Sequence, residues 1–176
     1  YPCPVYSVEG NHDITHNNLD SVSKQPLGVL FAAGVFRHLR NEVFEEGDLR
    51  VRVVGLPYVP ERRAEDFTAI QKQSGDTHLI IVAHALASAN PPIGLDEMFG
   101  EPVLRYSDLV TEDGPDVVCF GHWHKDQGIE VVGSTHFVNQ GSVCRGALVQ
   151  ENLTRIPKVA SITITPAGVL VEQLSL

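Results

Sequence analysis

The sequence is poor in cysteine and has no long apolar run. Its three cysteines, Cys3, Cys119 and Cys144, are an odd number without framework spacing, which argues against a disulfide-stapled fold. No window approaches the ~18 consecutive apolar residues of a membrane span, and we expect no signal peptide. We therefore predict a cytoplasmic protein that does not enter a membrane, in which Cys119 is a buried, reduced thiol.

Positive charge is also scarce. Thirteen Lys and Arg face 22 Asp and Glu, for a formal net charge of -9. This balance is wrong for a generic nucleic-acid binder, which needs clustered basic residues, but it suits an acidic pocket that reaches phosphate through metal ions. The 176 residues, 43% of them hydrophobic, suit one globular domain. Because the chain opens at Tyr1 and enters a strand almost at once, we expect a piece of a longer protein.

Strand patterns outnumber helix patterns. Strands are predicted at residues 5–9, 42–44, 49–56, 78–82, 116–120, 130–132, 135–138, 159–165 and 169–174. Arg50 and Arg52 alternate with valines, which is typical of a half-exposed strand. Helical character is predicted for residues 20–33, for about 14 residues from Pro60, and for residues 107–112; residues 85–100 are predicted to form a long loop. The strand-rich tail favours an α/β fold with mixed sheets and outer helices.

Two short histidine motifs and one further histidine follow predicted strands. Residues 10–13 read Gly-Asn-His-Asp, residues 121–124 read Gly-His-Trp-His, and His84 ends the apolar run 79–83. This pattern places the side chains at the C-terminal rim of a sheet, where α/β proteins usually build their sites. Imidazole nitrogens with an amide oxygen suit Mn, Fe, Zn or Ni. His78 and His38, by contrast, are expected at the surface, at the ends of elements.

In this order the motifs resemble those of the calcineurin-like metallophosphoesterase superfamily. The resemblance implies an αββα fold, a mixed β-sandwich flanked by helices. It also implies that residues 1–176 are the C-terminal part of a single domain whose N-terminal portion is missing. The family's earlier Asp-x-His and Gly-Asp-x-x-Asp motifs have no counterpart here, and Gly47-Asp48, in a predicted hairpin turn, is not accepted as a substitute. Activity is therefore expected only with the missing segment.

The resemblance assigns a role to each motif residue. Two divalent metal ions would hold a bridging hydroxide that attacks the phosphodiester. Manganese is the expected metal, and iron, zinc and nickel are the alternatives. His12 would contact the scissile phosphate and assist the leaving group, with Asp13 orienting it. One metal would be bound by Asn11, His84 and His122, and the other by His124.

A finer resemblance, to the DNA-repair exonuclease branch, rests on three segments. These are Gly-Leu-Pro-Tyr at 55–58, the run from Asn139 to Gly146 and the run from Arg155 to Val159, with Gln140 departing from the branch's usual proline. It implies a DNA exo- or endonuclease that works with an SMC-like ATPase. Separately from the resemblance, Arg145 is a candidate contact to a substrate phosphate; the alternative, commoner for such an arginine, is that it caps carbonyls or pairs with an acid such as Glu151. The alternatives to the nuclease are a small-molecule or cyclic-nucleotide phosphodiesterase, a non-catalytic scaffold of the same fold and, more weakly, a protein phosphatase. The oligomeric state stays open.

Overall fold

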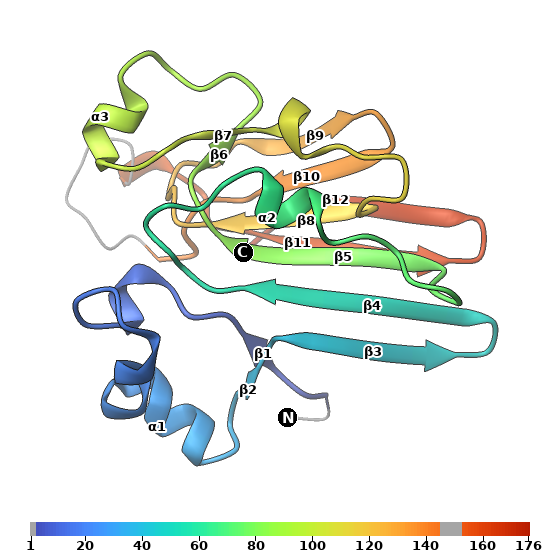
Figure 1. Cartoon of the computed structure of the whole chain (residues 1–176), viewed down its shortest axis with the longest axis horizontal. Helices are drawn as coiled ribbons and strands as arrows, with labels where there is room; N and C mark the ends of the chain where they lie inside the picture. Colours follow the sequence, from blue (N-terminus) through green and yellow to red (C-terminus); the bar gives the residue numbers. More distant parts are fainter. Residues whose placement is uncertain (1–2, 145–152) are drawn as a thin grey trace.

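The computed structural model describes residues 3–144 and 153–176. Its centre is a six-stranded sheet in the order β3-β4-β5-β8-β10-β9 (Figure 1). The four central strands run parallel, and an antiparallel strand closes each edge. The strands are β3 (Asn41–Glu46), β4 (Leu49–Leu56), β5 (His78–His84), β8 (Val117–Gly121), β9 (Gly128–Val132) and β10 (Thr135–Asn139).

Side chains alternate along the central strands, so the sheet has two apolar faces. One face packs against Phe67 of α2 (Glu65–Thr68) and against Tyr106 and Leu109 of the 3-10 helix η3 (Tyr106–Leu109). The other face packs against a hairpin of β11 (Lys158–Thr165) and β12 (Gly168–Ser175), red in Figure 1. The predicted mixed α/β class is confirmed, with a two-stranded second layer.

A small N-terminal unit (blue in Figure 1) lies beside β3 and β4. Its strands β1 (Tyr6–Ser7) and β2 (Arg37–His38) pair in parallel. Two backbone hydrogen bonds fix this unit to the end of β4: Gly55 donates to the Arg40 carbonyl, and Tyr58 donates to the Glu9 carbonyl, each at 2.8 Å. The remaining elements are η1 (Asn11–Asp13), η2 (Leu19–Lys24), α1 (Pro26–Ala32), β6 (Ala87–Ser88), α3 (Leu95–Phe99) and β7 (Leu104–Arg105).

Helices are shorter than predicted. The helix expected from Pro60 is reduced to the four residues of α2, because backbone groups beyond it find partners elsewhere: Lys72 donates to the Asp113 carbonyl at 2.9 Å. The helical stretch 20–33 is divided at Gln25, whose extended conformation (φ -109°, ψ 163°) is the one favoured before a proline. The predicted loop 85–100 contains β6 and α3, and the loop assignment was wrong there.

Two polar residues lie deeper than predicted. Arg52 is 6% exposed and His78 is 7% exposed, so β4 is not a half-exposed strand and His78 is not a surface residue. Arg52 is tolerated in the interior because its guanidinium bonds to Asp76 at 2.6 Å and also contacts Gln73 and Asn41.

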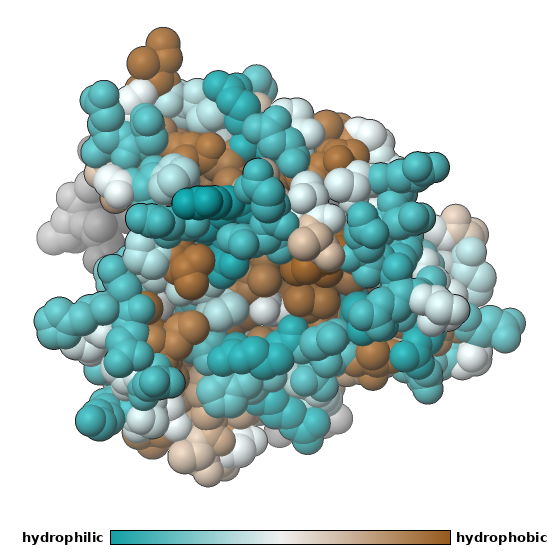
Figure 2. Space-filling view, in the orientation of Figure 1, coloured by the Kyte–Doolittle hydropathy of each residue, from teal (hydrophilic) through white to brown (hydrophobic). Residues whose placement is uncertain are grey.

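Three further findings concern the thiol of Cys119, the length of the helices and the hydrophobic patches on the surface. Cys119 is a free thiol, as predicted, but only half-buried, and burial raises its pKa to about 12. Within the described ranges, no helix is long and apolar enough to cross a membrane. The space-filling view shows several separate hydrophobic patches set among hydrophilic side chains (Figure 2).

Candidate active site

The candidate site lies where parallel strands end. His84 closes β5 and is paired in register with Gly121, the last residue of β8, so His122 emerges beside His84. Asn11 reaches the same place from η1, which follows β1. Tyr58 follows β4, and its ring lies 5.9 Å from the His84 ring. The ends of β5 and β8 and the N-terminal unit therefore bring together, at one rim, residues that are far apart in sequence.

Three donor atoms converge at this rim. His84 Nε2 lies 3.0 Å from Asn11 Oδ1 and 3.2 Å from His122 Nδ1. Two imidazole nitrogens and an amide oxygen form a ligand set for a borderline divalent cation, so the trio fits one ion. In the described part of the chain, no three His, Cys, Asp or Glu side chains form such a group; this set includes an amide.

The ring of His84 is closely confined by two glycines. A Cβ at Gly10 would lie 2.7 Å from its Cε1 atom, and a Cβ at Gly121 would lie 3.2 Å from its Nδ1 atom. Burial, followed by the charges of His122, His12 and His124, lowers the pKa of His84 to about 4. A lowered pKa keeps the imidazole neutral near pH 7, which is the form that binds metals.

His12, Asp13 and His124 surround the trio without joining it. The Asp13 carboxylate accepts the Gly10 N–H at 2.9 Å, so it braces the turn that carries Asn11. The predicted role of Asp13 in orienting His12 stays a prediction. Burial, followed by the influence of His12, His122 and Arg155, lowers the pKa of His124, so these three side chains lie within electrostatic reach of it.

The segment after β10 packs against the second histidine motif. Asn139 is 1% exposed; its Nδ2 donates to the Trp123 carbonyl at 3.3 Å and its Oδ1 accepts the Gly141 N–H at 2.9 Å. Gly141 (φ 71°) lies so close to His124 that a Cβ there would be 2.6 Å from the His124 carbonyl oxygen. The predicted phosphate contact, Arg145, lies outside the described residues.

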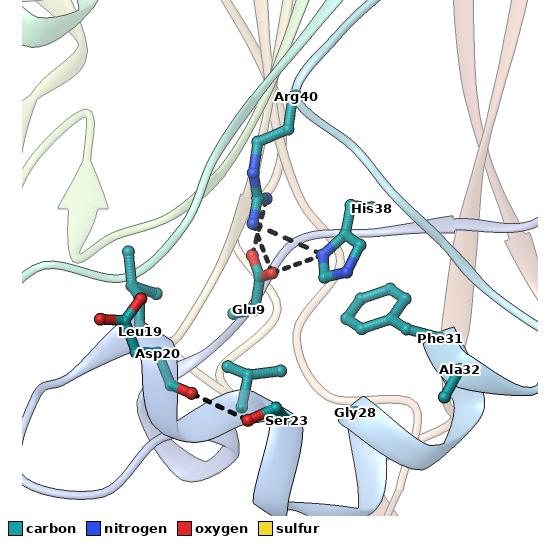
Figure 3. A pocket seen from close by; sticks show the side chains of 10 residues that line it. Glu9, Leu19, Asp20, Ser23, Gly28, Phe31, Ala32, His38 and Arg40 are labelled. Atoms are coloured by element: carbon teal, nitrogen blue, oxygen red, sulfur yellow. Dashed lines mark hydrogen bonds and ion pairs between the residues drawn. The ribbon is translucent and has the colours of Figure 1, made fainter.

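Sequence reasoning missed a buried carboxylate next to the first motif. Glu9 is 1% exposed, and its two oxygens accept hydrogen bonds from Arg40 at 2.6 and 2.8 Å. Burial raises the pKa of Glu9, but hydrogen bonds from Arg40 and His38 outweigh this and lower it. Phe31 stacks on His38 at the edge of a cavity of about 490 Å³ (Figure 3). The only hint of Glu9 in the sequence is that an acidic residue directly precedes Gly10 of the first motif.

A second missed carboxylate, Glu101, contacts His122 Nε2. It comes from the segment after α3, which the sequence marked only as the end of a long loop. No motif signals this residue, because its role depends on where α3 directs the chain.

The backbone at His122 is strained, with φ at 91° in a residue other than glycine. Strain at such a position, about 1–3 kcal/mol, is typical of functional sites and exceeds the ~0.5–1 kcal/mol entropic cost of glycine. The strain at position 122 can be measured by urea unfolding of two variants that both lack the imidazole. We expect His122→Gly to be more stable than His122→Ala by about 1 kcal/mol; a less stable glycine variant would show that no strain is stored there.

Residues 1–126 match the model of the family described as calcineurin-like phosphoesterase. The chain belongs to this family. No curated protein matches it. Metal-dependent phosphoester hydrolysis is the general activity of calcineurin-like phosphoesterases, which bind two divalent metals, and the match covers both histidine motifs and His84.

Proposed function

We propose that this chain is the C-terminal part of a phosphodiesterase domain that cleaves DNA as an exo- or endonuclease, with an SMC-like ATPase as its partner in the cytoplasm. The observation that carries the proposal is the approach of two atoms to His84 Nε2: Asn11 Oδ1 lies 3.0 Å from it and His122 Nδ1 lies 3.2 Å from it. The domain's other ligands would lie upstream of Tyr1, and His124 would serve the second ion.

The chain's own residues would divide the work of hydrolysis. When bound, the divalent ions, for which manganese is the expected metal, would supply Lewis acidity and an activated water for in-line attack. Asn11 and the neutral imidazoles of His84 and His122 hold an ion at the rim. His12, which is exposed beside them, donates a hydrogen bond to the phosphate and a proton to the leaving alkoxide.

The nuclease assignment is supported by where two branch-like segments lie. The first ends in Tyr58, whose ring lies 5.5 Å from the His122 ring. The second begins at Asn139 and packs against Trp123 and His124. Both segments therefore line the same rim as the motif histidines, which is expected if they shape the substrate site.

The test compares manganese-dependent cleavage of linear duplex DNA and of bis-p-nitrophenyl phosphate by the full-length protein and its His84→Ala variant. Because the variant lacks a ligand, we expect both cleavages to fall by more than about 100-fold, beyond the usual effect of an outer-shell change. His136→Ala, at the opposite end of β10 from Asn139, is the matched histidine control and should retain activity.

Each result points to one function. DNA cleavage lost in His84→Ala supports the nuclease. Cleavage of the small diester alone identifies a small-molecule phosphodiesterase. No cleavage of either substrate, with no bound metal, overturns the enzyme and leaves a scaffold of the same fold.

A further inference from the structure

Glu101 is placed against His122 by the end of α3. Gly100 caps this helix with a φ of 70° and turns the chain toward the strand rim. The Glu101 side chain is 8% exposed and the His122 side chain is 7% exposed, so the carboxylate and imidazole meet away from water. The carboxylate contacts Nε2, the ring nitrogen opposite the one that faces the trio.

Two aromatic rings enclose this contact. The Phe99 ring lies 5.5 Å from the His122 ring, and so does the ring of Tyr58. Burial raises the pKa of Tyr58, and the nearby Glu101 carboxylate raises it further. Glu101 therefore lies close to Tyr58 while its carboxylate contacts His122 Nε2.

An ionised carboxylate only accepts hydrogen bonds, so the nitrogen that contacts it must carry the proton. A neutral imidazole has one such proton. The other nitrogen of His122, Nδ1, is then bare, and this is the atom that lies 3.2 Å from His84 Nε2. Without Glu101, the two tautomers of His122 would compete, and the one protonated on Nδ1 could not donate a lone pair to the site.

We propose that Glu101 is a positioning residue that holds His122 in the Nε2–H tautomer, so that Nδ1 is the metal-binding atom. The inference rests on the proposed function for its metal, but the tautomer is a property of the metal-free chain. Glu101 does not reach the ion itself, because the imidazole ring lies between its carboxylate and the trio.

The test measures two quantities on this chain. Nitrogen-15 NMR of the imidazole nitrogens reads the tautomer of His122 without metal, and calorimetry with Mn²⁺ alone reads affinity. In Glu101→Ala we expect a mixture of tautomers and a 10–100-fold loss of Mn²⁺ affinity, the usual effect of removing an outer-shell partner. Glu101→Gln still offers an oxygen to the Nε2 proton, so it should keep the tautomer and most of the affinity.

Glu97→Gln is the matched control, because it removes the same charge from an exposed position on α3 and should change neither quantity. Wild-type His122 protonated on Nδ1 would overturn the proposal, and so would a Glu101→Ala variant that keeps the Nε2–H tautomer. If the wild type shows the expected tautomer but the full-length protein binds no Mn²⁺, the proposed function fails while the positioning role of Glu101 stands.

Discussion

Adding one methyl group at position 10 is expected to remove metal-dependent hydrolysis. In Gly10→Ala the new Cβ would lie 2.7 Å from Cε1 and 2.9 Å from Nδ1 of His84. The ring has little room to move, because Gly121 also lies close to it: a Cβ there would be 3.2 Å from His84 Nδ1. The imidazole would be pushed away from Asn11, and a displacement of about 1 Å at a reacting centre can cost about 100-fold in rate. Rates of diester cleavage by the full-length protein measure this loss.

Two other glycine substitutions calibrate that result. In Gly121→Ala the closest approach to His84 is 3.2 Å, so a smaller loss is expected, between the wild type and Gly10→Ala. Gly47→Ala is the control for backbone strain alone, since it lies in the β3–β4 turn at φ 58° with open space around it. It should lower stability and leave the rate unchanged. Equal rates for Gly10→Ala and the wild type would contradict the close confinement of His84.

The largest stability loss is expected from Arg52→Met. The Asp76 side chain is fully buried and the Arg52 side chain is 7% exposed. Removing one partner of a buried pair leaves the other charge uncompensated, at a cost of about 3–5 kcal/mol; we expect about 3 kcal/mol, because Arg50 still lies 3.3 Å from Asp76. Urea unfolding at pH 7 measures the difference. Arg50→Met, 38% exposed at its side chain, is the neighbouring control and should cost less than about 1 kcal/mol.

The same pair makes stability depend on pH. Burial raises the pKa of Asp76, but hydrogen bonds from Arg52 and the Gln73 amide, with the charges of Arg52 and Arg50, bring it below the ordinary value of 3.8. The unfolded chain therefore takes up this proton first as pH falls. The stabilisation is fully present above about pH 4 and is lost as pH falls through the folded-state pKa. The difference in the free energy of unfolding between the wild type and Arg52→Met should therefore become smaller below pH 4. A difference that does not change with pH would contradict this account.

The site was more predictable from sequence than its supports. His84 and His122 could be placed together because each follows a strand, and the ends of parallel strands meet at one edge. Asn11 also follows a strand, but β1 belongs to the separate N-terminal unit, which reaches this rim through its hydrogen bonds to the end of β4. Glu9 and Glu101 could not be found this way. Each acts through a tertiary contact, with Arg40 and with His122, and neither partner is near in sequence. Arg145 and the roles of His12 and Asp13 stay predictions.

Strands were predicted better than helices for a similar reason. The hairpins β3–β4 and β11–β12 carry their own turn signals, at Gly47 and at Gly168, and both formed where expected. Helical propensity beyond α2 was overridden, because Lys72 found partners in Asp113 and Asp116 across the fold. The alternation of Arg50 and Arg52 with valines suggested that β4 is half-exposed. That prediction was wrong because the sequence does not show that Arg52 pairs with Asp76 in the interior.

The trio has a consequence for how the protein is made. Asn11 and His84 are 73 residues apart, and His84 and His122 are another 38 apart. During synthesis the last donor leaves the ribosome long after the first, and no local segment can assemble the three. Contacts of such long range form late in folding, after the contacts within the sheet have offset the entropic cost of closing the long loops between them. Metal binding at the rim would then stabilise β5, β8 and the N-terminal unit together by mass action, so metal affinity would report how much of the chain has completed its fold.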